Sequence, residues 1–337
     1  MAELAQSVAN SASPQPRRHG ISERWLSPLI LSPSLIAIFI FVYGFIGMTL
    51  WVSFSTWSSP RRDLTIISPL LVTYQKLFEN TRFQIGLRNT VVFTVLFLLA
   101  AVLVGLLLAI ALDQKLPARG LVRNIFLFPY ALSFVVTGVS WRWIFNPESG
   151  LTQLAEDLGI NWMLDKVGLG PLRIDWLIDP TVWGDLPMPD AVKAQIGIPI
   201  ALIPVVIAAT WQLSGFAMAM YLAGLGTISN DVREAAALDG ASTYQVYRHI
   251  IIPLLRPITV STLIILGHIS LKIFDLIFAM SGSGPGFATD VPGIFVYEQT
   301  FRATRYNTGA AASVVMLFLI CVVMIPYLAR SMKDVER

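Results

Sequence analysis

The stretch TVVFTVLFLLAAVLVGLLLAIAL occupies residues 90–112 and contains no charged residue and no proline over its 23 positions. An α-helix rises about 1.5 Å per residue, so a helix of this length reaches about 35 Å. The hydrocarbon core of a bilayer is about 30 Å thick. The stretch is therefore long enough to cross a membrane as one helix, and it indicates that lipid surrounds this part of the chain.

Five further apolar blocks accompany this stretch, and we expect each of them to form one membrane-spanning helix. They lie at residues 29–51, 125–141, 196–228, 257–280 and 309–328. The block at 196–228 is too long for one straight span, and Pro199 and Pro204 predict an irregular entrance to it. The predicted fold is an all-α membrane protein with six transmembrane helices. An even number of spans places both termini on the same side.

The whole composition agrees with a membrane protein. Of 337 residues, 55% are hydrophobic and 13% are charged, whereas about a quarter of a typical soluble domain is charged. The net charge of +3 does not favour nucleic-acid binding, because the basic residues are scattered among short loops. Cys321 is the single cysteine and there are three histidines, so neither a disulfide framework nor a metal site is supported.

The polar segment 1–24 is rich in Ser, Ala, Gln and Pro, and we expect it to be a flexible tail. A cleaved signal peptide is the competing interpretation. The apolar block at 29–51 is 23 residues long, however, whereas the core of a signal peptide has about 7 to 15. We therefore expect this block to remain as the first span. The predicted organisation is a tail at 1–24, a transmembrane domain at 25–333 and a short tail at 334–337.

The distribution of basic residues predicts the orientation, since Lys and Arg are in excess in short cytoplasmic loops. The loop 113–123 contains Lys115, Arg119 and Arg123, and both tails are basic, so we expect this loop and both termini in the cytoplasm. The loop 146–195 then faces outside, with eight acidic residues against three basic ones. It is either a small folded cap or a plain connector. Five basic residues oppose this orientation: Arg61, Arg62, Lys76, Arg82 and Arg88.

Residues 227–256, which we call the docking segment, are polar and lie between the fourth and fifth apolar blocks. They include EAAALDGASTYQVYRHIIIPL at 234–254. Ser229 or Asn230 can cap a short helix, and the positive end of the helix dipole suits Asp231. The alanines that follow favour continuation of this helix.

A glycine then interrupts the predicted helix at Gly240. A second short helix can follow through Val246, and Pro253 and Pro257 close the segment before the fifth block. The docking segment is therefore predicted to form a compact helix-turn-helix on the cytoplasmic face. Its small alanine surface lets another protein approach closely.

The docking segment resembles the EAA loop of ABC importer permeases, in which Glu-Ala-Ala is followed by a Gly and later by an Ile-x-Leu-Pro run. The residues that match are Glu234, Ala235, Ala236, Gly240, Ile250 and Pro253, with Ile252 in place of Leu. In that family the loop forms the coupling helix, which inserts into a cleft of a separate ATPase. The resemblance implies that the ATPase contact includes Glu234, Ala235, Ala236, Asp239, Gly240, Ala241 and Pro253.

Three other stretches are similar to the MalF/UgpA-like sugar permeases and extend the resemblance to about residues 25–333. They are LRNT from Leu87, FPYALSFVVTGVSWRWIFNPESG from Phe128 and FDLIFAMSGSGPG from Phe274, the last departing from FDxxxxxTxGGP at Ser281 and Ser283. The resemblance implies a MalF-like importer fold that moves a sugar by alternating access across the cytoplasmic membrane of a prokaryote. It implies as partners a second, related permease subunit, two ATPase subunits and an external solute-binding protein.

No G-x-x-x-x-G-K-[ST] loop occurs in the sequence, so we expect ATP and Mg²⁺ to be bound by the separate ATPase and no cofactor by this chain. The chain is accordingly not predicted to be an enzyme. The best enzymatic alternative is an intramembrane serine protease that uses Ser214 and His268, but Gln212 occupies a position where that class has glycine. A secondary transporter is a third alternative, although that class usually shows repeated halves.

An ionisable residue within a span costs several kcal/mol unless it faces water or a partner, so such residues are candidates for function. His268, Lys272 and Asp275 are spaced i, i+4 and i+7, which predicts one helical face. That face either lines the solute path, where it can bind sugar hydroxyls, or holds an ion pair between Lys272 and Asp275. Weaker candidates for the path are Asn89, Gln212 and Ser214. Glycerol 3-phosphate is an alternative solute, but this anion favours an Arg in the path, where the sequence places none.

Overall fold

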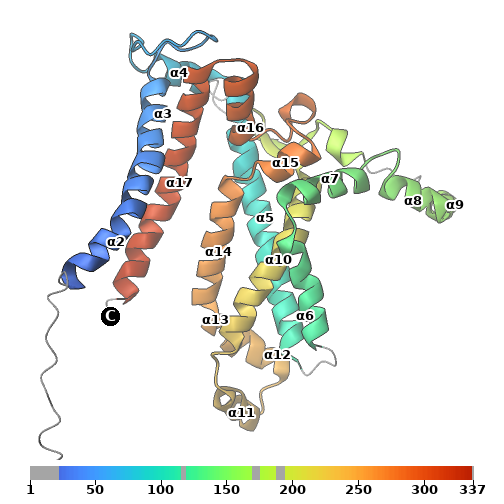
Figure 1. The fold of residues 1–337 in the computed structure, drawn as a ribbon. Helices are drawn as coiled ribbons and strands as arrows, with labels where there is room; N and C mark the ends of the chain where they lie inside the picture. The colour runs from blue at the N-terminus through green and yellow to red at the C-terminus, as the bar shows by residue number, and fades with distance from the viewer. Residues whose placement is uncertain (1–22, 115–118, 169–174, 187–193, 336–337) are drawn as a thin grey trace, which may run out of the picture. The chain divides into compact units, whose positions relative to one another are not determined.

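The computed structural model describes residues 23–114, 119–168, 175–186 and 194–335. The chain separates into two units at residues 1–49 and 50–337. Nearly all of the predicted tails, 1–24 and 334–337, lie outside the described residues. The described residues are mainly helical, as predicted, and Figure 1 gives the labels of the helices.

The first unit consists of the first predicted span. Helix α2 (Glu23–Ile38) continues through a π-helical turn, η1 (Phe39–Gly44), into α3 (Phe45–Ser53), whose last residues belong to the second unit. Together they give an apolar helix from Ile30 to Ser53, 24 residues long. This length is sufficient to cross a bilayer, as the block at 29–51 predicts.

The second unit is built around two long helices, α5 (Thr81–Asp113) and α10 (Leu202–Leu225), which pack against each other. The side chain of Asn80 caps α5 by accepting a hydrogen bond of 3.2 Å from the amide of Phe83. The buried residues between α5 and α10 are apolar and include Phe93, Phe97, Ala101, Val205, Ala209, Leu213 and Ala217. Both helices match predicted spans, and β2 (Ile196–Pro199) forms the irregular entrance predicted before α10.

The span predicted at 125–141 is not one continuous helix. Helix α6 (Arg119–Leu127) passes through a 3-10 turn, η2 (Phe128–Ala131), and α7 (Phe134–Ile144) then leaves at 99° to it. Pro129 lies in the turn, and the hydroxyl of Ser133 accepts a hydrogen bond from the amide of Val136, which caps α7 as a new helix. The apolar composition of this block reports burial in lipid or protein but not the bend.

The fifth predicted span, 257–280, is also interrupted. The docking segment continues from α12 (Thr243–Val246) through η4 (Tyr247–Ile251) and α13 (Ile252–Leu254) into α14 (Arg256–Leu271) with a bend of 61°. Helix α14 ends at Leu271, and the short α15 (Asp275–Met280) follows after a break. The block 257–280 is therefore two helices and not one.

The remaining elements lie around these helices. They are α4 (Val72–Glu79), α8 (Leu151–Asp157), α9 (Ile160–Lys166), η3 (Trp176–Ile178), β1 (Val182–Leu186), α11 (Asn230–Leu238), η5 (Pro285–Phe287), α16 (Pro292–Tyr297), η6 (Glu298–Arg302) and α17 (Tyr306–Val335). Strands β1 and β2 pair antiparallel, with Val182 opposite Pro199. The loop 146–195 thus contains short elements of its own within its described residues.

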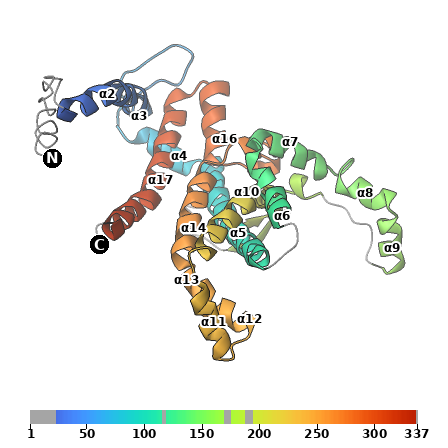
Figure 2. The same cartoon turned by 60° about the horizontal axis from the view of Figure 1, so that its bottom comes forward.

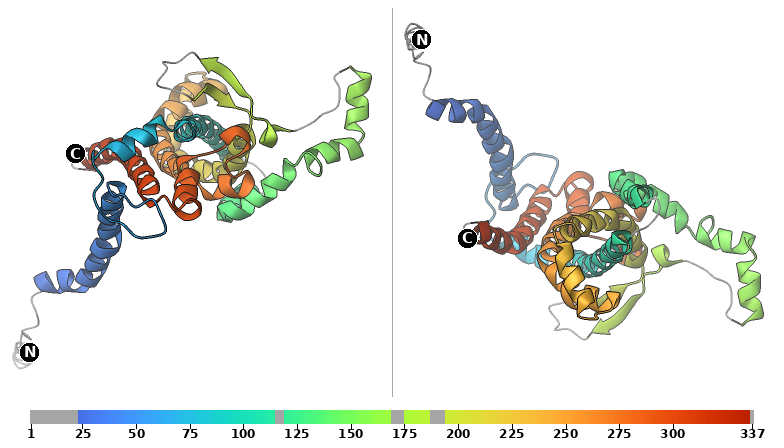
Figure 3. Two further views of the ribbon diagram at one scale, coloured as in Figure 1. Left: turned by 90° about the horizontal axis from the view of Figure 1, so that it is seen from above. Right: turned by 90° about the horizontal axis from the view of Figure 1, so that it is seen from below.

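Within the described residues, three helices are long and apolar enough to cross a membrane, or up to five when each bent pair counts as one span. Helix α17 also carries an apolar stretch at Tyr306–Val322. The predicted number of six spans stays a prediction. Figure 3, which looks along the helices from both ends, shows α5 and α10 surrounded by α6, α14 and the short helices.

Candidate functional site

The first half of the docking segment is α11, with Ser229 in the N-cap position. The helix ends in a Schellman motif, in which the amide of Ala241 donates to the carbonyl of Ala236 (3.0 Å) and the amide of Gly240 to the carbonyl of Ala237 (3.1 Å). Gly240 adopts a φ of 78°, which glycine reaches without the Cβ penalty of other residues. The predicted interruption of the helix at Gly240 is confirmed.

The second half of the docking segment starts with a capping box. The amide of Gln245 donates to the hydroxyl of Ser242 (3.4 Å), and the amide of Ser242 donates to the side-chain oxygen of Gln245 (2.8 Å). These bonds start α12, and Pro253 lies in the following turn α13. The helix-turn-helix predicted for this segment is confirmed. Figure 2 shows α11 and α12 together beyond the ends of α5, α6 and α14.

The docking segment presents an apolar surface that the sequence reasoning missed. Leu238, at the end of α11, is 89% exposed, and Tyr244, at the start of α12, is 66% exposed. Of the residues expected at the ATPase contact, four are exposed, namely Glu234, Ala235, Asp239 and Gly240. Ala236 is buried. Ala241 and Pro253 are half-buried. Leu238 and Tyr244 thus place two exposed large side chains beside these residues, and the position of Leu238 within a polar segment was the signal available in the sequence.

The docking segment is fastened to the end of α5 by a carboxylate. Asp113 accepts a hydrogen bond of 2.7 Å from Nη1 of Arg233, on α11, and one of 2.6 Å from the hydroxyl of Tyr247, in η4. The side-chain amide of Gln114 donates to the same hydroxyl (3.2 Å). The side chain of Asp113 is 14% exposed, so these charge-assisted bonds are sheltered from water. Both halves of the docking segment are thus bound to one residue.

The three ionisable residues predicted on one face of the fifth span do not lie on one helix. His268 is in the last turn of α14, Lys272 follows the end of this helix with φ −108° and ψ 8°, and Asp275 begins α15. The i, i+4, i+7 relation requires a continuous helix, which the break after Leu271 removes. The predicted shared face is therefore wrong, although all three residues still lie within a stretch of eight.

Lys272 and Asp275 are exposed at this break, and no ion pair joins them in the part of the chain that the structure describes. The structural alternative, a Lys272–Asp275 pair between packed spans, is thus not formed. His268 is half-buried, and its Nδ1 is buried without a hydrogen-bond partner among the described residues. No hydrogen bond connects His268 with Ser214 in these residues either, so the arrangement expected of a serine protease is absent there.

The weaker path candidates are buried in the chain. Asn89 is fully buried, and its amide donates to the carbonyls of Phe287 (2.9 Å) and Asp290 (2.8 Å). The amide of Gln212 donates to the carbonyl of Leu132 (2.8 Å), while Ser214 is 5% exposed. Asn89 thus fastens α5 to a loop, and a solute contact for these residues stays a prediction.

A buried charge cluster lies at the end of α5 away from the docking segment. Nε of Arg82 is 2.5 Å from a carboxylate oxygen of Asp290, and Nη1 of Arg82 is 2.6 Å from one of Glu298. Burial raises the pKa of Asp290 to about 6, while the hydrogen bond and charge of Arg82 act to lower it. Sequence reasoning noted Arg82 only as an exception to the charge bias, because its partners are about two hundred residues away.

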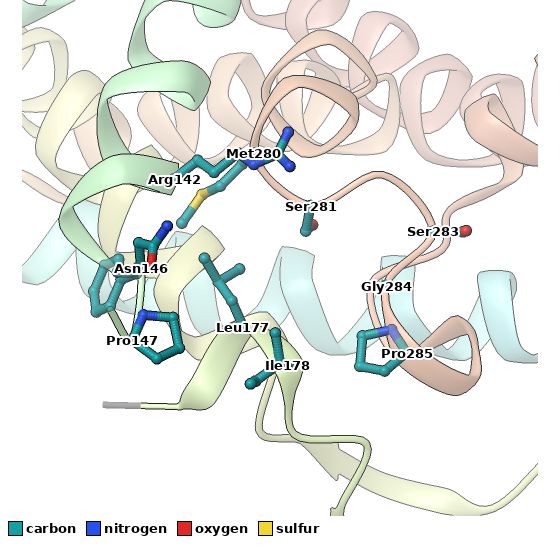
Figure 4. Close-up of a pocket in the computed structure, with 11 residues that line it drawn as sticks. Arg142, Asn146, Pro147, Leu177, Ile178, Met280, Ser281, Ser283, Gly284 and Pro285 are labelled. Carbon is teal, nitrogen blue, oxygen red and sulfur yellow. The ribbon is translucent and has the colours of Figure 1, made fainter. Parts of the chain in front are cut away.

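A cavity of about 450 Å³ lies between the end of α7 and the turn after α15 (Figure 4). Its polar lining comes from Arg142, Asn146, Ser281 and Ser283. The turn is held by Thr289, whose hydroxyl accepts from Ser281 (3.0 Å) and donates to the carbonyl of Gly282 (3.0 Å). The FDxxxxxTxGGP-like stretch therefore forms a closed turn despite its two serine substitutions.

Comparison with known proteins supports one family. The model of the family described as "binding-protein-dependent transport system inner membrane component" matches residues 101–332. A probable ABC transporter permease protein of Pyrococcus horikoshii is 37% identical over 92% of this chain and 96% of its own length. The xylose/arabinose import permease protein XacH of Haloferax volcanii is 32% identical over 85% of this chain and 82% of its own.

Two more comparisons concern a relative named for trehalose and maltose transport and a solved structure. The trehalose/maltose transport system permease protein MalF of Thermococcus litoralis is 29% identical, covering 91% of this chain and 93% of its own. The crystal structure of a bacterial ABC transporter that imports the acidic polysaccharide alginate aligns with a TM-score of 0.67 at 22% identity, over 92% of this chain and 95% of that one. This structural likeness shows a common fold.

Proposed function

This chain belongs to the family of binding-protein-dependent transport system inner membrane components, and from this premise we propose that it is the permease subunit that moves a sugar in an ATP-driven importer. The family consists of ABC transporter permeases, so the chain is a membrane subunit and not an enzyme. The sugar as cargo is supported by relatives named for xylose and arabinose, for trehalose and maltose, and for starch degradation products.

The observation that carries this proposal is the docking segment. A short helix with an exposed leucine at its end, held to a long span by a sheltered carboxylate, has the form of a docking element for another protein. In an importer of this family the partner at such an element is the ATPase, which supplies the energy that this chain cannot obtain alone. The proposed contact includes Glu234, Ala235, Ala236, Asp239, Gly240, Ala241 and Pro253. We add Leu238 and Tyr244 to it because both side chains are exposed beside them.

The proposed assembly contains a second, related permease subunit, two ATPase subunits and an external solute-binding protein. The binding protein is supported by the family description and by a similar alginate transporter solved in complex with a periplasmic protein that holds an alginate pentasaccharide. ATP and Mg²⁺ bind to the ATPase subunits. Alternating access follows if ATP-driven closure of the ATPase pair moves the docking segment and the spans attached to it.

The proposed function is tested with the complete complex, isolated through a tag on this chain and placed in proteoliposomes. Radiolabelled xylose, arabinose, trehalose, maltose and glycerol 3-phosphate are offered with the binding protein, with and without ATP. We expect ATP-dependent uptake of at least one sugar. Uptake of glycerol 3-phosphate alone would contradict the proposal that the solute is a sugar. Uptake that does not require ATP would contradict the proposal that the complex is an ATP-driven importer.

The proposed orientation places the docking segment in the cytoplasm and α8 outside. In a Cys321→Ser background, Asp157→Cys should react with an impermeant maleimide in intact cells, while Ser242→Cys should react only after the membrane is opened. Asp157 and Ser242 are both exposed in the chain, so a difference in labelling reports the side of the membrane. The opposite pattern would invert the orientation.

The exposed charges at the α14–α15 break give a test of the solute path. Lys272→Ala and Asp275→Ala should each lower uptake about tenfold or more while assembly stays normal, because neither side chain holds an ion-pair partner among the described residues. For the same reason the swap of Lys272→Asp with Asp275→Lys should not restore uptake.

Uptake rate and solute affinity are measured beside the yield of assembled complex. Lys76→Ala, which removes an exposed Lys from α4, is the control for a general effect of charge. Unchanged rate and affinity in both alanine variants would remove Lys272 and Asp275 from the path.

A further inference from the structure

Helix α5 carries ionic contacts at both of its ends. The ion pairs that join different elements within the described ranges are Arg82–Asp290, Arg82–Glu298 and Asp113–Arg233, and each has one partner on α5. Arg82 is the second residue of this helix and Asp113 is its last. The two ends of one helix are thus the points at which charged groups bind the rest of the bundle.

At its C-terminal end, α5 is bound to the docking segment. Arg233 immediately precedes Glu234 of the proposed ATPase contact, and Tyr247 lies on the other half of the segment. Both donate to the carboxylate of Asp113, at 2.7 Å and 2.6 Å. A displacement of either half of the docking segment therefore pulls on the same residue of α5.

At its N-terminal end, α5 is bound to residues 281–302, which we call the distal segment. Arg82 contacts Asp290 and Glu298, and Asn89 donates to two backbone carbonyls of the same segment. The side chain of Asp290 is fully buried, and Asn89 is fully buried as well. Breaking buried charged contacts leaves an unpaired charge, so these contacts hold the distal segment to α5 firmly.

Between these ends α5 is continuous for 33 residues and contains no proline. A helix of this length extends about 50 Å. Its middle is packed closely on α10, where a Cβ added to Gly105 would lie 2.5 Å from the Cβ of Ala217. By contrast, two other elements near the docking segment bend, by 99° between α6 and α7 and by 61° before α14, while α10, which leads directly into the segment, is unbroken but shorter than α5 at 24 residues. A displacement of one end of a continuous, closely packed helix moves its other end, whereas a bend between two helices can change its angle instead.

We propose that α5 is the rod through which the docking segment moves the distal segment, with Asp113 and Arg82 as the positioning residues at its two ends. The proposal rests on the proposed docking of an ATPase. ATP binding closes the ATPase pair and shifts α11, the Asp113 carboxylate transfers this shift to α5, and Arg82 and Asn89 carry it to residues 281–302. The distal segment borders the cavity at Ser281 and Ser283, so this motion changes the far end of the molecule.

The test follows the residue directly after the distal segment, and it needs no knowledge of the sugar. Ala303→Cys is placed in a Cys321→Ser background, since Ala303 is exposed and its amide bonds to the carbonyl of Glu298. In the purified complete complex, the rate of reaction with a maleimide is compared without nucleotide and with Mg-ATP and orthovanadate. We expect the rate to change at least threefold on nucleotide trapping in this background, and to stay constant when Asp113→Asn is added.

Asp113→Asn keeps an acceptor for Tyr247 and removes the charge that binds Arg233, so the segment stays folded. The control is Lys76→Ala, which removes an exposed cation from α4, outside the docking segment. This variant should keep the threefold response. The charge swap of Asp113→Arg with Arg233→Asp should regain at least part of it, which a loss of folding would not allow.

The outcomes separate the two proposals. If the ATPase does not copurify with the otherwise unmodified permease, the proposed docking fails. If it copurifies and binds nucleotide, but Asp113→Asn responds like its parent, α5 is not the rod. A parent complex in which the rate of labelling at position 303 does not change on trapping also overturns the proposal, because the distal segment then does not follow the ATPase.

Discussion

Leu238→Asp is expected to abolish uptake while the permease remains inserted and folded. The side chain of Leu238 is 89% exposed, so its replacement removes almost no contact within the chain. Burial of a leucine in a partner contributes about 1.5–3 kcal/mol, and a carboxylate placed in the same pocket adds a desolvation cost. Each 1.4 kcal/mol corresponds to about tenfold in affinity, so the ATPase should bind at least about a hundredfold more weakly.

The measurement is the amount of ATPase that copurifies with the tagged permease, together with uptake in the same membranes. Leu158→Asp is the matched control, because Leu158 is 65% exposed at the end of α8 and lies outside the docking segment. It should retain the ATPase. Normal copurification and normal uptake in Leu238→Asp would show that the exposed end of α11 is not the docking surface.

Local sequence signals predicted the docking segment well because its structure is built from local bonds. The positive φ of Gly240 and the Ser242–Gln245 capping box act within a few residues of each other. A sequence shows such features directly. The exposure of Leu238 could not be predicted in the same way, since a leucine in a short helix more often packs inward.

The spans were predicted as apolar blocks, but two of the bends were not. Hydrophobic runs indicate which residues avoid water, but they carry no information on where a helix changes direction. The bend between α6 and α7 coincides with Pro129, which was a usable signal. The break between α14 and α15 falls at Lys272 to Phe274, where the sequence has neither glycine nor proline. The helical face drawn through His268, Lys272 and Asp275 failed for this reason.

The polar contacts that hold the bundle together were invisible to sequence patterns. Asp113 and Arg233 are 120 residues apart, and Arg82 and Asp290 are 208 apart. No periodicity joins residues at such separations, so only the folded chain shows that they meet. The sequence does show these charges next to apolar blocks, which is where a buried partner is needed.

Gly215→Ala is expected to destabilise the assembled permease, although alanine normally favours a helix by about 1 kcal/mol over glycine. Gly215 lies in α10 where α6 crosses it, and a Cβ at this position would lie 2.0 Å from the carbonyl oxygen of Phe126 and 2.9 Å from its carbonyl carbon. Both atoms are backbone, so relief requires that α6 move away from α10. Overpacking of this kind costs about 1–3 kcal/mol, and more where a backbone shift is forced.

The matched control is Gly267→Ala in α14, where a Cβ would meet nothing closer than Cδ1 of Leu98 at 3.8 Å, an ordinary contact. This variant should equal or exceed the parent protein in thermal midpoint, whereas Gly215→Ala should lower the midpoint by several degrees and reduce the yield of detergent-solubilised complex. The two substitutions are chemically identical and differ in what the new methyl group meets. Equal midpoints for both variants would show that α6 and α10 do not approach as closely as the structure places them, and Gly215 would then have no packing role.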